Sequence, residues 1–180
     1  MITILRAADR AATPWKNGGG ITREVAIWPP GSKFDDFDWR ISMAGVREPG
    51  PFSVFEGIDR TMAILSGRLE LRLPDHTVVL SPESEPFAFA GDVTCEGIPV
   101  GGPVTDLNIM VRRGRAAARV TGFKGAAETI AEPHAVVVAT ARTTLLLGNE
   151  EYVLDVLDAA LIADARFSAS GQGYAIAFSR

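Results

Sequence analysis

Short apolar runs, rich in β-branched and aromatic residues, recur along the whole chain and are separated by turn-forming residues. Runs of this length, broken by Gly, Pro, Asn and Asp, predict strands. Many closely spaced strands are typical of an all-β sandwich or barrel. Only Asp155–Ala165 also has a helical pattern, and the repeat described next favours strands there. The predicted strands are Ile21–Trp28, Trp39–Val46, Thr61–Leu65, Leu69–Leu73, Thr77–Leu80, Thr105–Arg112, Val136–Thr140, Thr143–Leu147, Tyr152–Leu157 and Tyr174–Phe178.

An internal repeat relates two of the predicted hairpins. The segment Leu69–Leu80 aligns with Thr143–Leu154 without a gap, and their leucine and valine positions coincide. Pro74-Asp75 then falls on Gly148-Asn149, so both copies have turn residues in the middle. The match indicates duplication of a β unit, although two leucine-rich hairpins can also match by chance. Residues 120–134, rich in glycine and alanine, are the predicted connector between the halves.

In two of the predicted strands, alternation makes one face more polar than the other. In Thr105–Arg112 and in Trp39–Val46, every second residue belongs to the same face of a sheet. Such a polar row can face solvent, or it can line the interior of a small barrel that holds a ligand. The two rows are Asp106, Asn108, Met110 and Arg112 on one strand and Arg40, Ser42, Ala44 and Val46 on the other.

The segment Pro14–Gly20 is unusual because it ends in three consecutive glycines. Glycines permit positive φ and expose backbone N–H groups, which can form a concave anion site. Lys16 before the glycines and Arg23 after them would strengthen the attraction for a carboxylate or phosphate. The order of residues fits neither a P-loop nor a dinucleotide-binding motif. A tight bend before a strand is the alternative interpretation.

Composition narrows the class of protein. A chain of 180 residues with 47% hydrophobic and 22% charged residues is ordinary globular material. The net charge of −4 argues against general nucleic-acid binding, which needs a basic face. The single cysteine, Cys95, excludes an internal disulfide and fits a reducing compartment. Without a targeting segment or a membrane-spanning run, we expect a cytoplasmic protein.

Histidine is too scarce for the common metal and nucleophile chemistries. Only His76 and His134 are present, and neither has a neighbouring metal ligand. We therefore expect no metal site and no histidine-based catalysis. Cys95 is read as a small buried residue. Acid–base chemistry by Glu24 or Asp106 stays open, because a carboxyl group in an apolar cavity can be tuned.

Four motifs in order resemble the HutD/Ves family. They are Pro14–Gly20 with Thr22-Arg23-Glu24, then Trp39–Ser42, then Gly50–Ser53 with the following Asp59-Arg60, and Gly102–Asn108. The resemblance is dense to about residue 115. It implies a bicupin, two tandem double-stranded β-helix (jelly-roll) barrels, with residues 1–120 as the N-terminal barrel. Residues 121–180 would form a smaller cupin-like half, packed as one compact unit with the first.

The resemblance also implies a function. It points to a regulatory protein that binds a small carboxylate of histidine degradation, such as formylglutamate or urocanate, without metal or cofactor. The alternatives are a metal-independent isomerase or lyase using Glu24 or Asp106, and a protein-interaction module with an exposed aromatic patch. No nucleic acid or membrane partner is expected, and a homodimer through strand edges stays open. The pocket candidates are Trp15, Lys16, Asn17, Gly18, Arg23, Glu24, Arg40, Ser42, Phe52, Arg60, Asp106 and Asn108.

Overall fold

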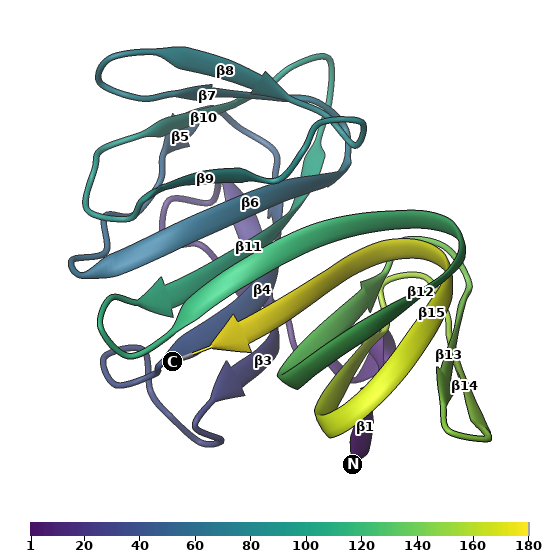
Figure 1. The fold of residues 1–180 in the computed structure, drawn as a ribbon. Coiled ribbons are helices and arrows are strands. Elements are labelled where there is room, and N and C mark those ends of the chain that lie inside the picture. Colours follow the sequence, from purple (N-terminus) through teal and green to yellow (C-terminus); the bar gives the residue numbers. More distant parts are fainter. Residues whose placement is uncertain (180) are drawn as a thin grey trace. The chain divides into compact units, whose positions relative to one another are not determined.

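The computed structural model describes the backbone of residues 1–179 and their side chains, except those of 126–133 and 164. The described chain is built of strands, with one short 3₁₀ helix, η1 (Ala7–Asp9), so the predicted all-β class is confirmed (Figure 1). None of the described residues forms a helix long and apolar enough to cross a membrane. The chain divides into two compact units, Ala11–Arg115 and Met1–Arg10 with Ala116–Arg180.

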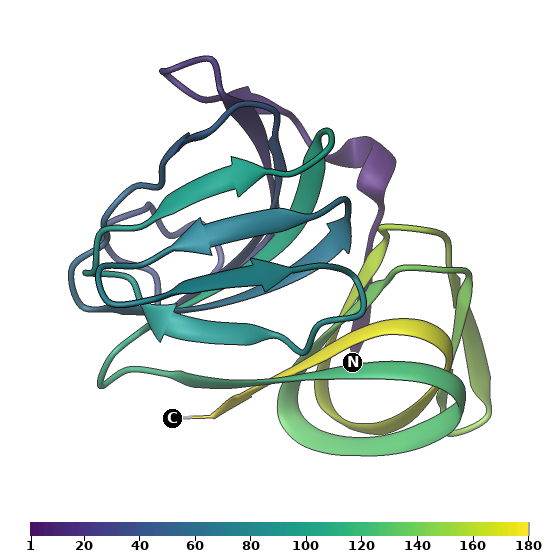
Figure 2. The ribbon, with the colours of Figure 1, turned by 90° about the horizontal axis from the view of Figure 1, so that it is seen from above.

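The unit Ala11–Arg115 contains two antiparallel sheets. A six-stranded sheet has the order β2-β3-β4-β11-β6-β9, and a four-stranded sheet has the order β5-β10-β7-β8. Figures 1 and 2 show the four-stranded sheet lying over one face of the six-stranded sheet. The strands are β2 (Thr13–Pro14), β3 (Gly20–Trp28), β4 (Trp39–Val46), β5 (Gly50–Pro51), β6 (Ile58–Ser66), β7 (Leu69–Arg72), β8 (Thr77–Leu80), β9 (Phe87–Ala90), β10 (Glu96–Pro99) and β11 (Val104–Arg112).

Two apolar clusters occupy the inner face of the six-stranded sheet. Near one end, Val46, Ile64 and Val104 pack with Leu69 and Leu80 of the four-stranded sheet. A second cluster is formed by Phe37, Ile58 and Met110, with Phe55 packed against it. Burial of these side chains removes apolar surface from water and fixes the two sheets against each other. The polar residues of the same inner face lie between the clusters.

The other unit is a five-stranded sheet with two long strands. Its order is β1-β15-β13-β14, and β12 also pairs with β15. Figure 2 shows β12 and β15 curving together as a pair. Its core is largely alanine, together with leucine and phenylalanine. The strands are β1 (Ile2–Leu5), β12 (Ala117–Ala139), β13 (Thr143–Leu147), β14 (Glu150–Leu154) and β15 (Ala159–Ser179).

Strand β12 corrects the expected connector at residues 120–134. The glycines suggested a loop, yet the segment pairs with β15 along its length, with a register shift between Gly125 and Glu128. Gly125 has φ of +97°, so the loop signal marks this local irregularity rather than the end of the strand. The strand β1 pairs with β15, which places residues 1–10 in this unit.

The two predicted hairpins are both present. Leu69 pairs with Leu80 at the base of β7–β8, and Thr143 pairs with Leu154 at the base of β13–β14. These pairs occupy equivalent positions of the internal repeat, so the two hairpins share one register. The segment after Asp155 belongs to a strand from residue 159 onward, as the repeat predicted.

Candidate functional site

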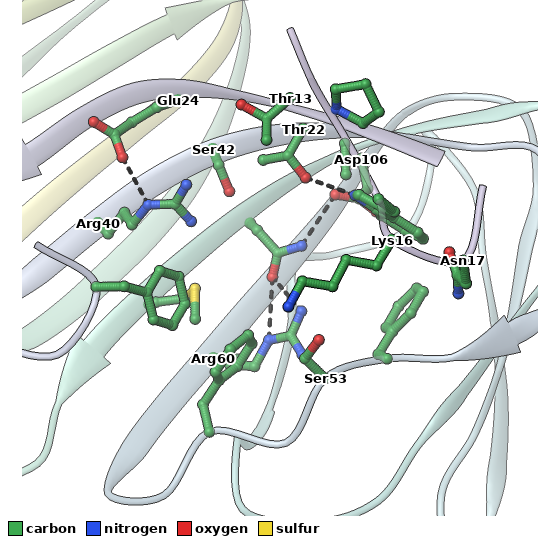
Figure 3. A pocket seen from close by; sticks show the side chains of 18 of the residues that line it. Thr13, Lys16, Asn17, Thr22, Glu24, Arg40, Ser42, Ser53, Arg60 and Asp106 are labelled. Atoms are coloured by element: carbon green, nitrogen blue, oxygen red, sulfur yellow. Dashed lines mark hydrogen bonds and ion pairs between the residues drawn. The ribbon is translucent and has the colours of Figure 1, made fainter. Parts of the chain in front are cut away.

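A cavity of about 910 Å³ lies within the unit Ala11–Arg115. The inner face of the six-stranded sheet forms its floor, and segments around β2 and β5 form its walls (Figure 3). Polar and aromatic side chains alternate around it, as in many small-molecule sites. It is lined by Ala11, Thr13, Pro14, Trp15, Lys16, Asn17, Thr22, Glu24, Phe34, Arg40, Ser42, Ala44, Pro51, Phe52, Ser53, Phe55, Arg60, Asp106, Asn108 and Met110.

The register of three neighbouring strands places the polar side chains of the floor. Strand β11 lies between β4 and β6, so Met110 pairs with Arg40 on one side and Arg60 on the other. Cross-strand partners share a face, and adjacent strands lie about 4.8 Å apart, so the Cα atoms of the two arginines are about 10 Å apart. Asn108 pairs with Ser42 in the next row of the same face.

Arg60 is a buried cation surrounded by aromatic rings. Only 6% of the residue is exposed. Its guanidinium carbon lies 5.8 Å from the ring centroid of Phe52, 5.4 Å from that of Phe55 and 5.0 Å from that of Phe89. Burial lowers the pKa of Arg60, and the neighbouring Asp106 carboxyl opposes that shift. A desolvated guanidinium held by aromatic rings is well suited to bind an anion.

A chain of hydrogen bonds connects Arg60 with Asp106. Arg60 donates to Asn108 Oδ1 from Nε at 3.2 Å and from Nη2 at 2.8 Å. Asn108 Nδ2 donates to Asp106 Oδ1 at 3.1 Å. Since no bond from Nη1 is found among the described residues, this edge of the guanidinium is available to a ligand.

Asp106 is the deepest acidic group of the cavity. Its exposure is 0%, and its Oδ2 has no hydrogen-bond partner among the described residues. Burial raises the pKa of Asp106 to about 7, against the opposing effects of Arg60, the Asn108 amide and the Ala44 N–H. Near neutral pH this carboxyl is therefore protonated in a substantial fraction of the molecules.

A second arginine lies at the more exposed side of the cavity. Arg40 Nε donates to Glu24 Oε2 at 2.8 Å, with 13% of the Arg40 side chain and 46% of the Glu24 side chain exposed. The guanidinium carbon of Arg40 also lies 5.2 Å from the ring centroid of Phe34. The pair orients Arg40 across the cavity floor, and the Nη atoms of Arg40 make no hydrogen bond to the described residues.

The glycine-rich turn has a conformational role. Gly18 has φ of +75°, and its N–H donates to the Trp15 carbonyl at 3.0 Å. The N–H of Gly19 donates to Asn17 Oδ1 at 3.0 Å. Both N–H groups are used inside the turn, so the expected backbone cradle for an anion is not formed by them. Lys16 instead points its side chain into the cavity (Figure 3).

Trp15 forms one wall and is fixed from two sides. Its Nε1 donates to Thr22 Oγ1 at 2.8 Å, and its ring meets Phe52 edge-on with centroids 6.1 Å apart. The chain passes so close at Gly20 that a Cβ atom there would lie 2.4 Å from the Gly45 carbonyl oxygen. Gly20 is thus required by close packing against β4.

Ten of the twelve pocket candidates line this one cavity. The exceptions are Gly18, in the turn, and Arg23, which lies on the opposite side of β3 from Thr22 and Glu24. Arg112 also turns away, because its guanidinium donates to the carbonyls of Phe37 and Asp35.

Several lining residues were missed by sequence reasoning. Thr22 could have been found by extending the alternation from Glu24, two residues later in β3. Phe34 lies in a loop, where no periodicity marks its direction. Ser53 and Thr13 likewise lack a strand pattern long enough to predict a face.

The side chains of the lining favour an anionic ligand. Lys16, Arg40 and Arg60 bring three positive charges, against Glu24 and the partly protonated Asp106. Among the described residues, no three His, Cys, Asp or Glu side chains gather in a group that could hold a metal ion. His76 lies in the β7–β8 turn beside Asp75, away from the cavity.

Comparison with solved structures first defines the class of protein. A cupin 2 barrel protein from Leptotrichia buccalis superposes with a TM-score of 0.58 over 88% of both chains at 9% identity, which shows a shared fold. HutD from Pseudomonas fluorescens SBW25, in a formate condition, superposes with a TM-score of 0.87 at 28% identity, covering 99% of this chain and 98% of that one. The fold is that of a cupin.

Sequence comparison then gives the family. An uncharacterised 21.2 kDa protein in the hutC 3′ region of Pseudomonas putida is 34% identical over 158 residues, covering 84% of this chain and 76% of the relative. Protein Ves of Citrobacter koseri is 39% identical over 112 residues, 59% of this chain and 56% of the relative. The HutD family model matches residues 7–177, so the chain belongs to the HutD family.

Proposed function

We propose that the cavity binds a small carboxylate metabolite and that the protein acts as a sensor of it. The observation that supports this most strongly is Arg60, a guanidinium 6% exposed on the cavity floor with Nη1 unbonded among the described residues. A carboxylate would accept from that edge in a charge-assisted hydrogen bond. Lys16, pointing into the same cavity, would add a second positive charge.

The spacing of the arginines favours a ligand with two carboxylates. Arg40 and Arg60 flank Met110 on the floor. A chain with carboxylates at both ends and an apolar middle would contact Arg60, the Met110 side chain and Arg40 in turn. Formylglutamate has two carboxylates and urocanate has one, so formylglutamate fits this arrangement better.

The link to histidine degradation is supported by the names of relatives. The Pseudomonas putida relative is described by its position in the hutC 3′ region, and the Pseudomonas fluorescens relative is HutD itself, in a formate condition. We extend that context to this chain, as a cytoplasmic regulator without cofactor or metal. All lining residues belong to the one unit Ala11–Arg115, so the proposal does not depend on a homodimer.

One observation favours a second candidate, a metal-independent acid–base enzyme. Asp106 has a pKa raised to about 7 by burial, which suits a general base near neutral pH. Its free Oδ2 is closed to solvent, however, so it has no direct path to a substrate proton. Binding without turnover is therefore the better-supported function.

A thermal-shift screen tests the proposal. The ligands are N-formylglutamate, urocanate, formiminoglutamate and histidine, with N-formylglutamine as a matched analogue that lacks the second carboxylate. Ligand at about 100 times its Kd should stabilise the protein by about 2.7 kcal/mol. We expect N-formylglutamate to give the largest shift and N-formylglutamine a smaller one.

Two variants make the screen specific. Arg60→Met should lose the shift, while Arg72→Met, which removes an exposed arginine of β7 outside the cavity, should retain it. No shift with any of the four ligands at millimolar concentration would overturn the histidine-pathway proposal. Mass spectrometry of the ligand after long incubation would reveal turnover and favour the enzyme.

A further inference from the structure

The chain Asp106–Asn108–Arg60 joins a fully buried carboxyl group to the proposed ligand-binding cation. An asparagine amide has one donor side and one acceptor side. Asn108 turns its Nδ2 to Asp106 and its Oδ1 to Arg60, so one contact fixes the orientation required for the other. Asp106 thus determines how Arg60 is held, although the two side chains share no direct hydrogen bond.

Asp106 belongs to the lining of the cavity and is its most deeply buried acidic group. Its exposure is 0%, and Oδ2 is both closed to solvent and unpartnered among the described residues. Toward the cavity, Asp106 is hydrogen-bonded through Oδ1, which accepts from the Asn108 amide. Oδ2 is accordingly the atom that holds a proton when the carboxyl is neutral.

The charged and titratable groups around Asp106 come from several elements. Arg60 on β6 interacts with it electrostatically, and Cys95, before β10, interacts with Arg60. Farther along the cavity lie Arg40 on β4, Glu24 on β3 and Lys16 in the β2–β3 turn. No histidine is among the residues that line the cavity. Asp106 is the fully buried acid in this set, and Glu24 is the other carboxyl, which serves as a control.

We propose that Asp106 is a positioning residue which acts through Asn108 on Arg60, and that binding of a carboxylate at Arg60 is coupled to proton uptake from solvent by Asp106. The inference rests on the proposed function, since it assumes that the anion binds at Arg60. It assigns to this cavity an affinity that rises as the pH falls.

The physical reason is competition for the charge of Arg60. When Asp106 is ionised, its negative charge partly compensates the guanidinium and repels an incoming carboxylate. When Asp106 is neutral, Arg60 is uncompensated and binds the carboxylate more strongly. By reciprocity, a bound carboxylate favours the protonated form of Asp106. The pKa of about 7, raised by burial, places the change within the accessible pH range.

The first experiment follows Arg60 directly and needs no ligand. The side-chain Nε–H resonance of Arg60 is followed by NMR in the full-length protein from pH 5.5 to 8.5. We expect it to shift with a midpoint near pH 7, because this N–H donates to Asn108. Asp106→Asn should abolish the shift and Glu24→Gln should retain it. A flat wild-type resonance, or a shift that survives Asp106→Asn, would overturn the coupling.

The second experiment measures affinity by calorimetry at pH 6 and pH 8. N-formylglutamate is the probe, because its amino group is blocked and its carboxylates stay ionised over this range. Wild type should bind N-formylglutamate roughly fivefold more tightly at pH 6 than at pH 8. Between these two pH values, one titrating group can change the affinity by at most about tenfold. Asp106→Asn should bind at pH 8 about as tightly as wild type does at pH 6.

Proton uptake is obtained from the wild type alone. Titrations at pH 7.5 in HEPES and in Tris, two buffers with different enthalpies of ionisation, should differ in heat and show a fraction of a proton taken up per ligand bound. Equal affinity at both pH values with no proton uptake would contradict the inference and leave carboxylate binding intact. Failure of any carboxylate to bind would contradict the proposed function, and the Arg60 resonance would then decide the coupling by itself.

Discussion

Arg60 on β6 donates two hydrogen bonds to one atom of β11, Asn108 Oδ1, from Nε at 3.2 Å and from Nη2 at 2.8 Å. The register explains the contact. Asn108 pairs with Met62, so Arg60 lies diagonally from it on the same face of the sheet. Both residues are more than nine-tenths buried, so the polar groups of each need the other residue as a hydrogen-bond partner.

Asn108→Leu is therefore expected to lower the free energy of unfolding by about 2 kcal/mol or more, because it leaves the buried Arg60 guanidinium without its acceptor. Ser42→Ala is the matched control, since Ser42 is the cross-strand partner of Asn108, is about as buried, and makes no side-chain hydrogen bond to the described residues. Urea unfolding measures both. Equal losses in the two variants would contradict this role of Asn108.

Asp106 should make the stability of the fold depend on pH in an unusual direction. Its pKa is raised to about 7 in the folded protein, whereas an aspartate in an unfolded chain titrates near 3.9. Between these values the folded state binds more protons, so the contribution of Asp106 to the free energy of unfolding falls as the pH rises from about 4 to 7.

The variant Asp106→Asn removes this dependence. Relative to wild type, its free energy of unfolding should rise by about 2.6 kcal/mol between pH 5 and pH 8, for a pKa of 3.9 in the unfolded chain and about 7 in the folded protein. Chemical denaturation at four pH values measures the difference. A constant difference over this range would show that Asp106 titrates as an ordinary aspartate.

Gly20 and Gly18 separate steric contact from backbone strain in the same turn. Gly20→Ala would place a Cβ 2.4 Å from the Gly45 carbonyl oxygen, a clash with backbone that cannot move cheaply. We expect Gly20→Ala to lower the free energy of unfolding by more than about 2 kcal/mol. In Gly18→Ala the new Cβ meets no atom within 4 Å, so only the backbone strain of an alanine at φ of +75° remains. This strain should lower the free energy of unfolding by about 1 kcal/mol. Thermal unfolding should rank them in this order, and the reverse order would contradict the close approach of β3 to β4.

Asp158 should anchor the N-terminal segment in the unit that contains β15. Its carboxylate accepts from Arg6 Nη1 at 2.7 Å, from the Ala7 N–H at 2.7 Å and from the Asp155 N–H at 3.1 Å. Although burial alone would raise the pKa of Asp158, these hydrogen bonds together lower it. Asp158→Ala should therefore lower the free energy of unfolding by about 2 kcal/mol, because hydrogen bonds to a carboxylate are among the stronger ones in proteins.

The control for Asp158 is Asp155→Ala, because the Asp155 side chain is exposed and only its N–H joins the contact. Hydrogen exchange of the amides of β1 reports the anchoring. Faster exchange in the Asp158 variant alone is expected, and unchanged protection in β1 would contradict the role.

Much of the fold could be predicted from local pattern. The strands β3, β4 and β11 and both hairpins follow from alternation and turn residues, because each is determined by neighbouring residues. Strand β1 could not be predicted to pair with β15, since that pairing joins Ile2 to Ile162 across most of the chain. The length of β12 was missed for the same reason: pairing with β15 overrides the loop signal of its glycines.

The site was predictable where it lies on regular strands. Alternation placed Arg40, Ser42, Asp106 and Asn108 on common faces, and the register then brought those faces together. The role of the glycines and the direction of Arg23 were harder, because motif resemblance names positions without giving a side chain's direction. The raised pKa of Asp106 depends on its burial in the folded protein and has no signal in the sequence.

We propose that Arg60 binds a ligand carboxylate in the cavity of the unit Ala11–Arg115. A crystal structure of the protein soaked or co-crystallised with N-formylglutamate at millimolar concentration tests it most directly. We expect one carboxylate within hydrogen-bond distance of Arg60 Nη1, with the second carboxylate toward Arg40. Ligand density elsewhere on the protein, with the cavity beside Arg60 holding only water, would contradict it.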